Sequence, residues 1–246
     1  MTFALVPLFV GFFFFQGAYK NFRPKFGLAN RTIFKSLFSL GIQYFIIKIA
    51  MLVIHKTNNF LIAGYASLDE VPQYEAAFKY LSIFLIFFMI LTNQLWAANV
   101  EAYQKKDYTW MRKNMRDVLK IWLGTTLVSV GMVIVSPWFF DLWLGDKLQI
   151  PFMLTVMVAL SIVLTTWVNM FNLVLNGTGK IRMQMLTWLG ASLLNIPVSI
   201  FFATTLGMGT IGIVLGTVVC LLPLAVLAPI QVYMILNQKE KGIWGR

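Results

Sequence analysis

The chain consists of long apolar runs separated by short polar connections. About 20 consecutive apolar residues are enough to cross the hydrocarbon core of a bilayer as a helix. By this criterion the sequence predicts spans at 2–19, 37–64, 74–99, 118–140, 150–175, 184–206 and 210–236. We therefore predict an all-α, polytopic bundle of transmembrane helices, in which 37–236 forms a six-helix lobe and 1–19 a single preceding helix.

The positive charges between these runs predict how the helices are oriented. Most of the 20 lysines and arginines fall within 20–36, 101–120, 180–182 and 237–246. These segments share one side of the membrane if successive helices alternate in direction, and the positive-inside rule makes that side cytoplasmic. We expect 20–36 to be a basic cytoplasmic linker and 237–246 a cytoplasmic tail that contains the C-terminus.

The same alternation places Met1 on the outer side of the membrane, which is unusual for the start of a chain. Residues 2–19 lack the basic start and the small-residue cleavage site of a signal peptide. We therefore expect the chain to be a fragment that begins inside a longer protein. A natural half-size protein with a short translocated N-terminus is the alternative.

The basic segment 101–120 has a helical pattern of its own. Trp110, Met111, Met115 and Val118 recur at helical spacing, with lysines and arginines between them. This pattern predicts an amphipathic helix that lies in the cytoplasmic interface before the 118–140 span. Such a helix either binds anionic lipid or serves only as a basic anchor that fixes the topology.

Composition supports the bilayer as solvent, and the placement of the charges argues against a nucleic-acid partner. The chain is 59% hydrophobic and 12% charged, whereas soluble domains contain about 25% charged residues. The net charge of +11 is spread between apolar runs and forms no basic patch, so we expect no nucleic-acid partner. Cys220 is the only cysteine, which excludes a disulfide framework and a thiolate metal cluster.

Motifs of enzymes are missing from the sequence. The chain contains no phosphate-binding glycine loop, no GxSxG elbow and no HExxH motif. Its acidic residues do not pair within a span, and His55 has no nearby carboxylate or thiol in sequence to complete a metal site. We therefore predict no enzymatic activity, no cofactor and no bound metal.

The span at 37–64 contains polar residues that a helix facing only lipid would not tolerate. Tyr44, Lys48, His55 and Asn59 fall on one face of this helix. Lys48 is too deep for easy snorkelling, and a lysine near the bilayer centre costs roughly 2.5–3.5 kcal/mol. We predict that this face meets water, a ligand or a polar partner. A backbone partner for Lys48 and a structural hydrogen bond for His55 are the alternatives.

A second polar face lies at the end of the 150–175 span. Asn169, Asn172 and Asn176 recur at spacings of three and four residues, which places them on one side of a helix. Buried carboxamides need hydrogen-bonding partners in an apolar environment. These residues are candidates for contacts with sugar hydroxyls, and contacts between helices are the alternative.

Three stretches of the chain, taken in order, resemble one family of membrane proteins. They are TNNFLIAGYASLDEVPQYEAAFKYLSI at 57–83, QLWAANVEAYQKKDYTWMRK at 94–113, and LVLNGTGKIRMQMLTWLGASLLNIPVSIFFATTLGMGTIGIVLGT at 173–217. They resemble helix junctions in the second half of polysaccharide flippases, a branch of the multidrug/oligosaccharidyl-lipid/polysaccharide exporter superfamily. The resemblance covers about residues 20–235 and identifies the chain as the C-terminal half of such a protein.

The resemblance implies two six-helix lobes around a cavity that opens alternately to either side of the bacterial inner membrane. It implies that lipid-linked oligosaccharides, such as O-antigen units of lipopolysaccharide or capsule units, are the substrates. In this scheme 1–19 is the last helix of a missing N-terminal lobe. The partners are then the lipid-linked substrate and that lobe or a second chain. Lys48 would attract the pyrophosphate or acidic sugars of the substrate.

Two other functions fit part of the sequence. One is a cation-coupled multidrug exporter of the same superfamily, and the other is a non-transporting membrane scaffold or gene remnant. Family members often carry an acid after the threonine that corresponds to Thr57, where this chain has Asn58 and Asn59. A proton or sodium site usually needs a carboxylate, so this departure argues against the exporter.

Overall fold

The computed structural model describes residues 31–245, together with residues 10, 14, 16 and 19 (the side chains of residues 32 and 146 excepted). The predicted helix at 1–19 and most of the linker at 20–36 therefore lie outside the described residues. The chain divides into two units, 1–41 and 42–246. In the first unit, 31–41 form the opening turns of a helix on which the rings of Phe34 and Phe38 stack at 5.7 Å.

Six helices are long and apolar enough to cross a membrane among the described residues, and these residues contain no strand. The first is α2 (Arg31–Tyr65), and the second joins α3 (Val71–Asn93) to α4 (Leu95–Gln104). The others are α5 (Tyr108–Leu144), α6 (Phe152–Thr178), α7 (Arg182–Ile200) with a π-helical turn η5 (Phe201–Thr205), and α8 (Gly209–Leu236). The six spans predicted between 37 and 236 are confirmed, and the protein is a multi-pass membrane protein.

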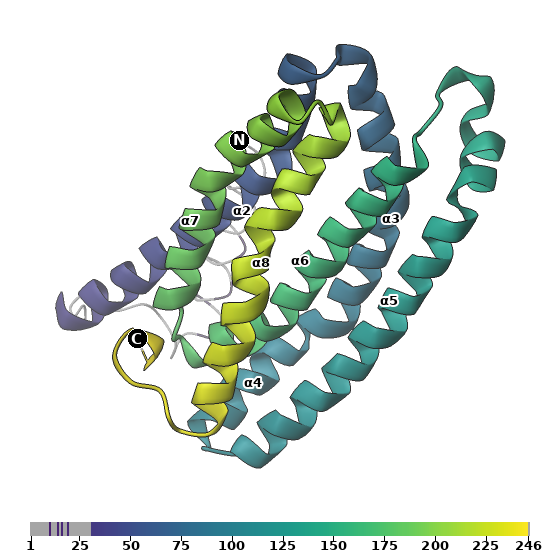
Figure 1. Ribbon diagram of the computed structural model, residues 1–246. Helices are drawn as coiled ribbons and strands as arrows, with labels where there is room; N and C mark the ends of the chain where they lie inside the picture. Colours follow the sequence, from purple (N-terminus) through teal and green to yellow (C-terminus); the bar gives the residue numbers. More distant parts are fainter. Residues whose placement is uncertain (1–9, 11–13, 15, 17–18, 20–30, 246) are drawn as a thin grey trace. The chain divides into compact units, whose positions relative to one another are not determined.

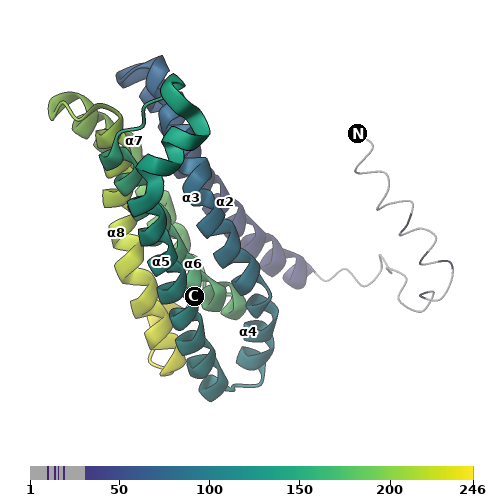
Figure 2. The ribbon, with the colours of Figure 1, turned by 90° about the vertical axis from the view of Figure 1, so that its right-hand side faces the viewer.

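The helices of the second unit alternate in direction, as Figures 1 and 2 show. The α4–α5 turn, the α6–α7 turn and the chain beyond α8 lie at one end, which we call the basic end because it carries Lys105, Lys106, Lys180, Lys239 and Lys241. The short helices η3 (Leu68–Glu70) and η4 (Gly145–Lys147) and the turn η5 lie at the opposite end. The charges predict a cytoplasmic side only if successive helices alternate in direction, as these helices do.

The amphipathic segment at 101–120 is not a separate helix, which corrects the sequence-based prediction. Residues 108–120 are the first turns of α5, which continues without a break to Leu144 and is about 55 Å long. The Asp107 side chain accepts a hydrogen bond from Trp110 N (2.9 Å) and caps the helix. Met111 and Val118 are buried in a cluster with residues of α6 and α8. Because these apolar side chains pack against protein, the segment has no apolar face left to lie flat on lipid.

Small residues allow α7 and α8 to approach each other closely. Gly212 and Gly216 are four residues apart on α8, the spacing that is typical of tight helix contacts in membranes. A Cβ atom on Gly216 would lie 2.6 Å from Ser199 Cα, and one on Gly212 would lie 2.7 Å from the carbonyl of Phe202. The hydroxyl of Ser199 donates to the carbonyl of Ile213 (3.0 Å). Only glycine fits at these two positions.

A buried polar network links four helices. Asn195 Nδ2 on α7 donates to Thr217 Oγ1 on α8 (3.1 Å), and Thr217 donates to Asn58 Oδ1 on α2 (3.0 Å). Asn58 Nδ2 in turn donates to the hydroxyl of Tyr74 on α3 (3.2 Å). Asn58 therefore has a structural role, and none of the four residues is charged at neutral pH.

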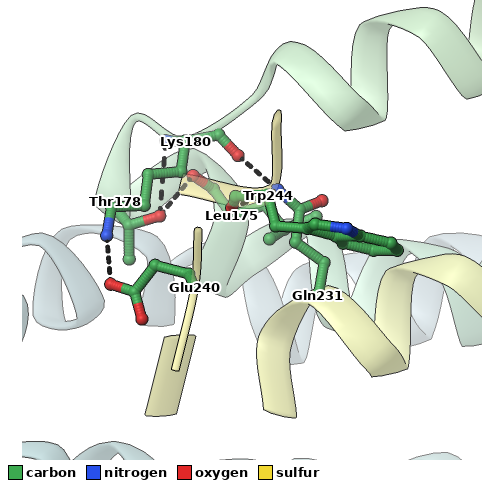
Figure 3. A network of polar contacts seen from close by, with 6 residues as sticks. All are labelled: Leu175, Thr178, Lys180, Gln231, Glu240 and Trp244. Carbon is green, nitrogen blue, oxygen red and sulfur yellow. Dashed lines mark hydrogen bonds and ion pairs between the residues drawn. The ribbon is translucent and has the colours of Figure 1, made fainter. Parts of the chain in front are cut away.

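The C-terminal residues fold back over the α6–α7 turn at the basic end (Figure 3). Lys180 in that turn forms an ion pair with Glu240, and the two side chains are only 18% and 15% exposed. The Lys180 ammonium also lies 5.4 Å from the ring centre of Tyr103 on α4. Gln231 Nε2 on α8 donates to the carbonyls of Lys180 (3.0 Å) and Trp244 (3.4 Å). These contacts tie α4, α6, α8 and the tail together.

Replacing Gly216 with alanine should destabilise the bundle. The added Cβ meets the backbone of Ser199 on α7, which cannot move away without displacing the helix. We expect a loss of about 1–3 kcal/mol in the free energy of unfolding, measured by denaturant titration in mixed micelles. Gly190→Ala on α7 is the control, since nothing lies within 4 Å of its added Cβ. Equal effects of the two substitutions would contradict the close α7–α8 contact.

The Lys180–Glu240 pair predicts a pH-dependent contribution to stability. Burial lowers the pKa of Lys180, but its contacts with Glu240 and Tyr103 raise it more, so the pKa lies above the ordinary value of 10.5. A raised lysine pKa means that the contribution is complete below about pH 10.5 and is lost as the pH rises through the folded-state pKa. Glu240→Gln should therefore lower the melting temperature at neutral pH and lose this effect in strong alkali.

The exposed pair between Glu101 and Lys105 provides the control for this experiment. Its side chains are 67% and 69% exposed, and such surface pairs contribute little to stability. Glu101→Gln should leave the melting temperature nearly unchanged. If Glu240→Gln were equally silent at neutral pH, the tail would not be held by this ion pair.

Candidate functional site

A cavity of about 330 Å³ lies within the second unit, between α2, α3, α4, α6 and α7. Polar side chains from several of the apolar spans line it. Its lining residues are Tyr44, Ile47, Lys48, Met51, Met89, Thr92, Asn93, Trp96, Asn169, Asn172, Leu173, Asn176 and Gln184. A cavity of this volume is large enough for part of a polar ligand.

Helix α2 contributes a cation and a phenol to the wall. Tyr44 and Lys48 are one turn apart and so face the same direction. The Tyr44 hydroxyl donates to the carbonyl of Asn176 on α6 (3.1 Å), which joins two walls of the cavity. The Lys48 side chain is exposed, and none of the ion pairs among the described residues includes it. Its charge is therefore available to a ligand.

The second wall is formed where α3 ends and α4 begins. The helix is interrupted at Gln94, and Asn93 and Trp96 on either side of this break line the cavity. The hydroxyl of Thr92 donates a hydrogen bond to the carbonyl of Phe88 (2.8 Å), and such a bond within a helix often accompanies a bend. The sequence predicts 74–99 as one span, in which Asn93, like the asparagines of α6, is expected to contact either sugars or neighbouring helices. Trp96 was not predicted to line a site.

The third wall carries carboxamides from α6 and α7. Asn169, Asn172 and Asn176 are on one face of α6 as predicted, and Asn172 Nδ2 donates to Asn169 Oδ1 (3.4 Å). Gln184 on α7 adds a further carboxamide, and its side chain is buried. Gln184 was missed because it stands at the start of the predicted 184–206 span, where a polar residue is usually interfacial.

His55 and Asn59 share the predicted face of α2 but do not line this cavity. They are two and three turns beyond Lys48, whereas the cavity extends along α2 only from Tyr44 to Met51. Asn59 Nδ2 donates to the carboxylate of Glu75 on α3, which is a contact between helices. One face of a long helix therefore serves two purposes, a ligand-sized cavity near one end and helix packing toward the other.

The chemistry of the cavity is recognition of a polar ligand. Carboxamides and the tyrosine hydroxyl supply hydrogen-bond donors and acceptors, Lys48 supplies one positive charge, and Trp96 supplies a flat apolar surface. Among the described residues, those that line the cavity include no carboxylate, thiol or imidazole. The described residues contain no cluster of three or more residues that could hold a metal ion.

The arrangement of six apolar helices around a cavity was compared with solved structures. A crystal structure described as a MATE mutant superimposes with a TM-score of 0.71 at 14% sequence identity. The match covers 87% of this chain and 48% of the other. The chain therefore has a MATE-like fold and spans about half the length of that protein.

The sequence comparison gives the family. The profile of the family described as "Polysaccharide biosynthesis protein" matches residues 2–150, which is more than half of the chain. The chain belongs to this family. No curated protein sequence matches it.

Cysteine scanning tests whether the cavity is open to water. Lys48→Cys and Asn93→Cys should react with a membrane-impermeant, charged maleimide, because both positions line the cavity and a thiol must ionise in water to react. Phe45→Cys is the control, since Phe45 is exposed on α2 but does not line the cavity and should meet lipid. The native Cys220 is buried in α8 and is replaced by alanine first. Equal labelling at positions 45 and 48 would contradict a hydrated cavity.

Proposed function

We propose that this chain is one lobe of a flippase that moves lipid-linked oligosaccharide across the bacterial inner membrane for polysaccharide biosynthesis. The observation that carries the proposal is the composition of the cavity wall: one unpaired lysine, Lys48, with a set of neutral carboxamides. The lysine would attract the pyrophosphate that links lipid to glycan, and the carboxamides would hydrogen-bond sugar hydroxyls. The tail at 237–246 and the rest of the basic end would then face the cytoplasm.

The carboxamides suit a sugar better than a drug-like cation. A carboxamide carries both a donor and an acceptor, the combination that matches a hydroxyl group. Five carboxamides line the cavity: Asn93, Asn169, Asn172, Asn176 and Gln184. Trp96 would stack against the apolar face of a sugar ring. The lobe would act as a transporter and perform no covalent chemistry.

The MATE-like fold also suits a cation-coupled drug exporter, which is the second candidate. The cavity disfavours it because Lys48 repels a cationic drug and the lining has no carboxylate to bind a drug or a coupling ion. A polysaccharide family match agrees with the first candidate.

A complete transport path would need a second lobe. The chain spans 48% of the length of the matched structure, and the cavity within this lobe would form one side of a larger path. We propose that an N-terminal lobe, or a second chain, supplies the other side.

Lys48→Ala tests the proposal when it is introduced into the protein together with the lobe or chain that completes the transport path. We expect surface polysaccharide to fall at least several-fold, because the substrate pyrophosphate loses its charge partner, while Lys48→Arg should keep much of the activity. Immunoblots or glycan staining of the cell envelope measure the effect. Lys56→Ala is the matched control, since Lys56 is an exposed lysine of the same helix that does not line the cavity.

Equal protein levels in the membrane must accompany this comparison. A Lys48→Ala variant with normal surface polysaccharide would remove Lys48 from the mechanism. If Lys48→Ala and Lys56→Ala reduced surface polysaccharide equally, the loss would reflect a general effect of charge on membrane insertion. That result would also contradict a role of Lys48 in binding substrate.

A further inference from the structure

A second, much smaller cavity of about 10 Å³ lies between α6, α7 and α8. Asn172 and Gln184 line this small cavity and also the larger one described above, so the two carboxamides form a shared wall. Trp188, one turn after Gln184 on α7, also lines the small cavity and is completely buried. The remaining lining is mostly apolar and includes Val168, Leu175 and Leu224.

Three buried polar atoms on these residues have no hydrogen-bond partner among the described residues. They are Asn172 Oδ1, Gln184 Oε1 and Trp188 Nε1. Two other polar side chains of the lining have partners: Thr187 donates to the carbonyl of Gln184 (2.9 Å), and Gln231 donates to the carbonyl of Lys180 (3.0 Å). A buried polar group without a partner is unfavourable, so three such groups on residues of one cavity favour the binding of a small polar ligand.

We infer that the small cavity binds one water molecule. Its volume is about that of a single water probe, and a buried water typically makes about three hydrogen bonds to polar groups that would otherwise lack partners. Water can donate to Asn172 Oδ1 and to Gln184 Oε1 and accept from the indole N–H of Trp188. One molecule then satisfies all three groups.

The same three groups exclude other small ligands. A metal or ammonium cation would face the N–H of Trp188 with no carboxylate in the lining. An anion would face two carboxamide oxygens and is larger than the space. Water is the small species that donates twice and accepts at least once.

The water also fixes how the shared wall faces the larger cavity. With Gln184 Oε1 bonded to water, the two N–H donors of the same carboxamide are left for a ligand on the other side. Both polar atoms of the Asn172 carboxamide then have partners, because Oδ1 accepts from the water and Nδ2 donates to Asn169 Oδ1. This effect on substrate recognition rests on the proposed function, whereas the water site itself does not.

A direct test is a structure of the whole protein, without substrate, at a resolution that resolves ordered water. We expect a single density peak within hydrogen-bonding distance of Asn172, Gln184 and Trp188. A cavity without density, or side chains that bond one another directly, would overturn the inference. Either result leaves the Lys48 experiment unaffected, so failure of the water site is distinguishable from failure of the proposed function.

A double-mutant cycle provides the second test. Gln184→Met removes the acceptor with little change in shape. Trp188→Phe removes the N–H donor together with part of a buried ring, a loss of volume that the Trp167→Phe control shares. If one water joins them, the loss of melting temperature in the double variant should be smaller than the sum of the two single losses. The control pairs Gln184→Met with Trp167→Phe, because the indole of Trp167 donates to the carbonyl of Ala225 (2.9 Å) and lines neither cavity. Additive losses in the test pair would contradict a shared water.

Discussion

The structure depends on one constraint: a polar group that enters the apolar part of a membrane must find a partner there. The chain meets this constraint in two ways. Asn58, Thr217 and Asn195 bond one another across helices and hold the bundle together. Lys48 and the carboxamides around it instead face a cavity, where water or a ligand must supply the partners. The first set gives the lobe its stability and the second gives it a site.

The helices could be predicted because the length of an apolar run is a local property of the sequence. How the segments between the helices fold depends instead on contacts between residues that are far apart in the sequence. The amphipathic pattern at 108–120 suggested an interfacial helix, but Met111 and Val118 pack against α6 and α8 and make the segment part of α5. The ion pair between Lys180 and Glu240 joins residues 60 positions apart, which no local pattern indicates.

The site was predictable where a polar residue is costly. Tyr44, Lys48 and the asparagines of α6 stood out in apolar runs, and the structure brings them to one cavity. Helical periodicity predicts which residues share a face of α2, but not how far the cavity extends along the helix. His55 and Asn59 are on the predicted face and lie beyond the end of the cavity. Gln184 and Trp96 were missed because such residues near the ends of spans usually mark the membrane interface. Binding of substrate by any of these residues stays a prediction.

The central claim is that this cavity receives a lipid-linked oligosaccharide, and photo-crosslinking tests it most directly. A benzophenone amino acid at Leu173, which lines the cavity, is compared with one at Leu193, which is 67% exposed on α7 and does not line it. The whole protein is irradiated in membranes that contain radiolabelled lipid-linked oligosaccharide. We predict glycan-containing adducts at position 173 and few at position 193. Equal adducts at both positions, or none at position 173, would contradict the account.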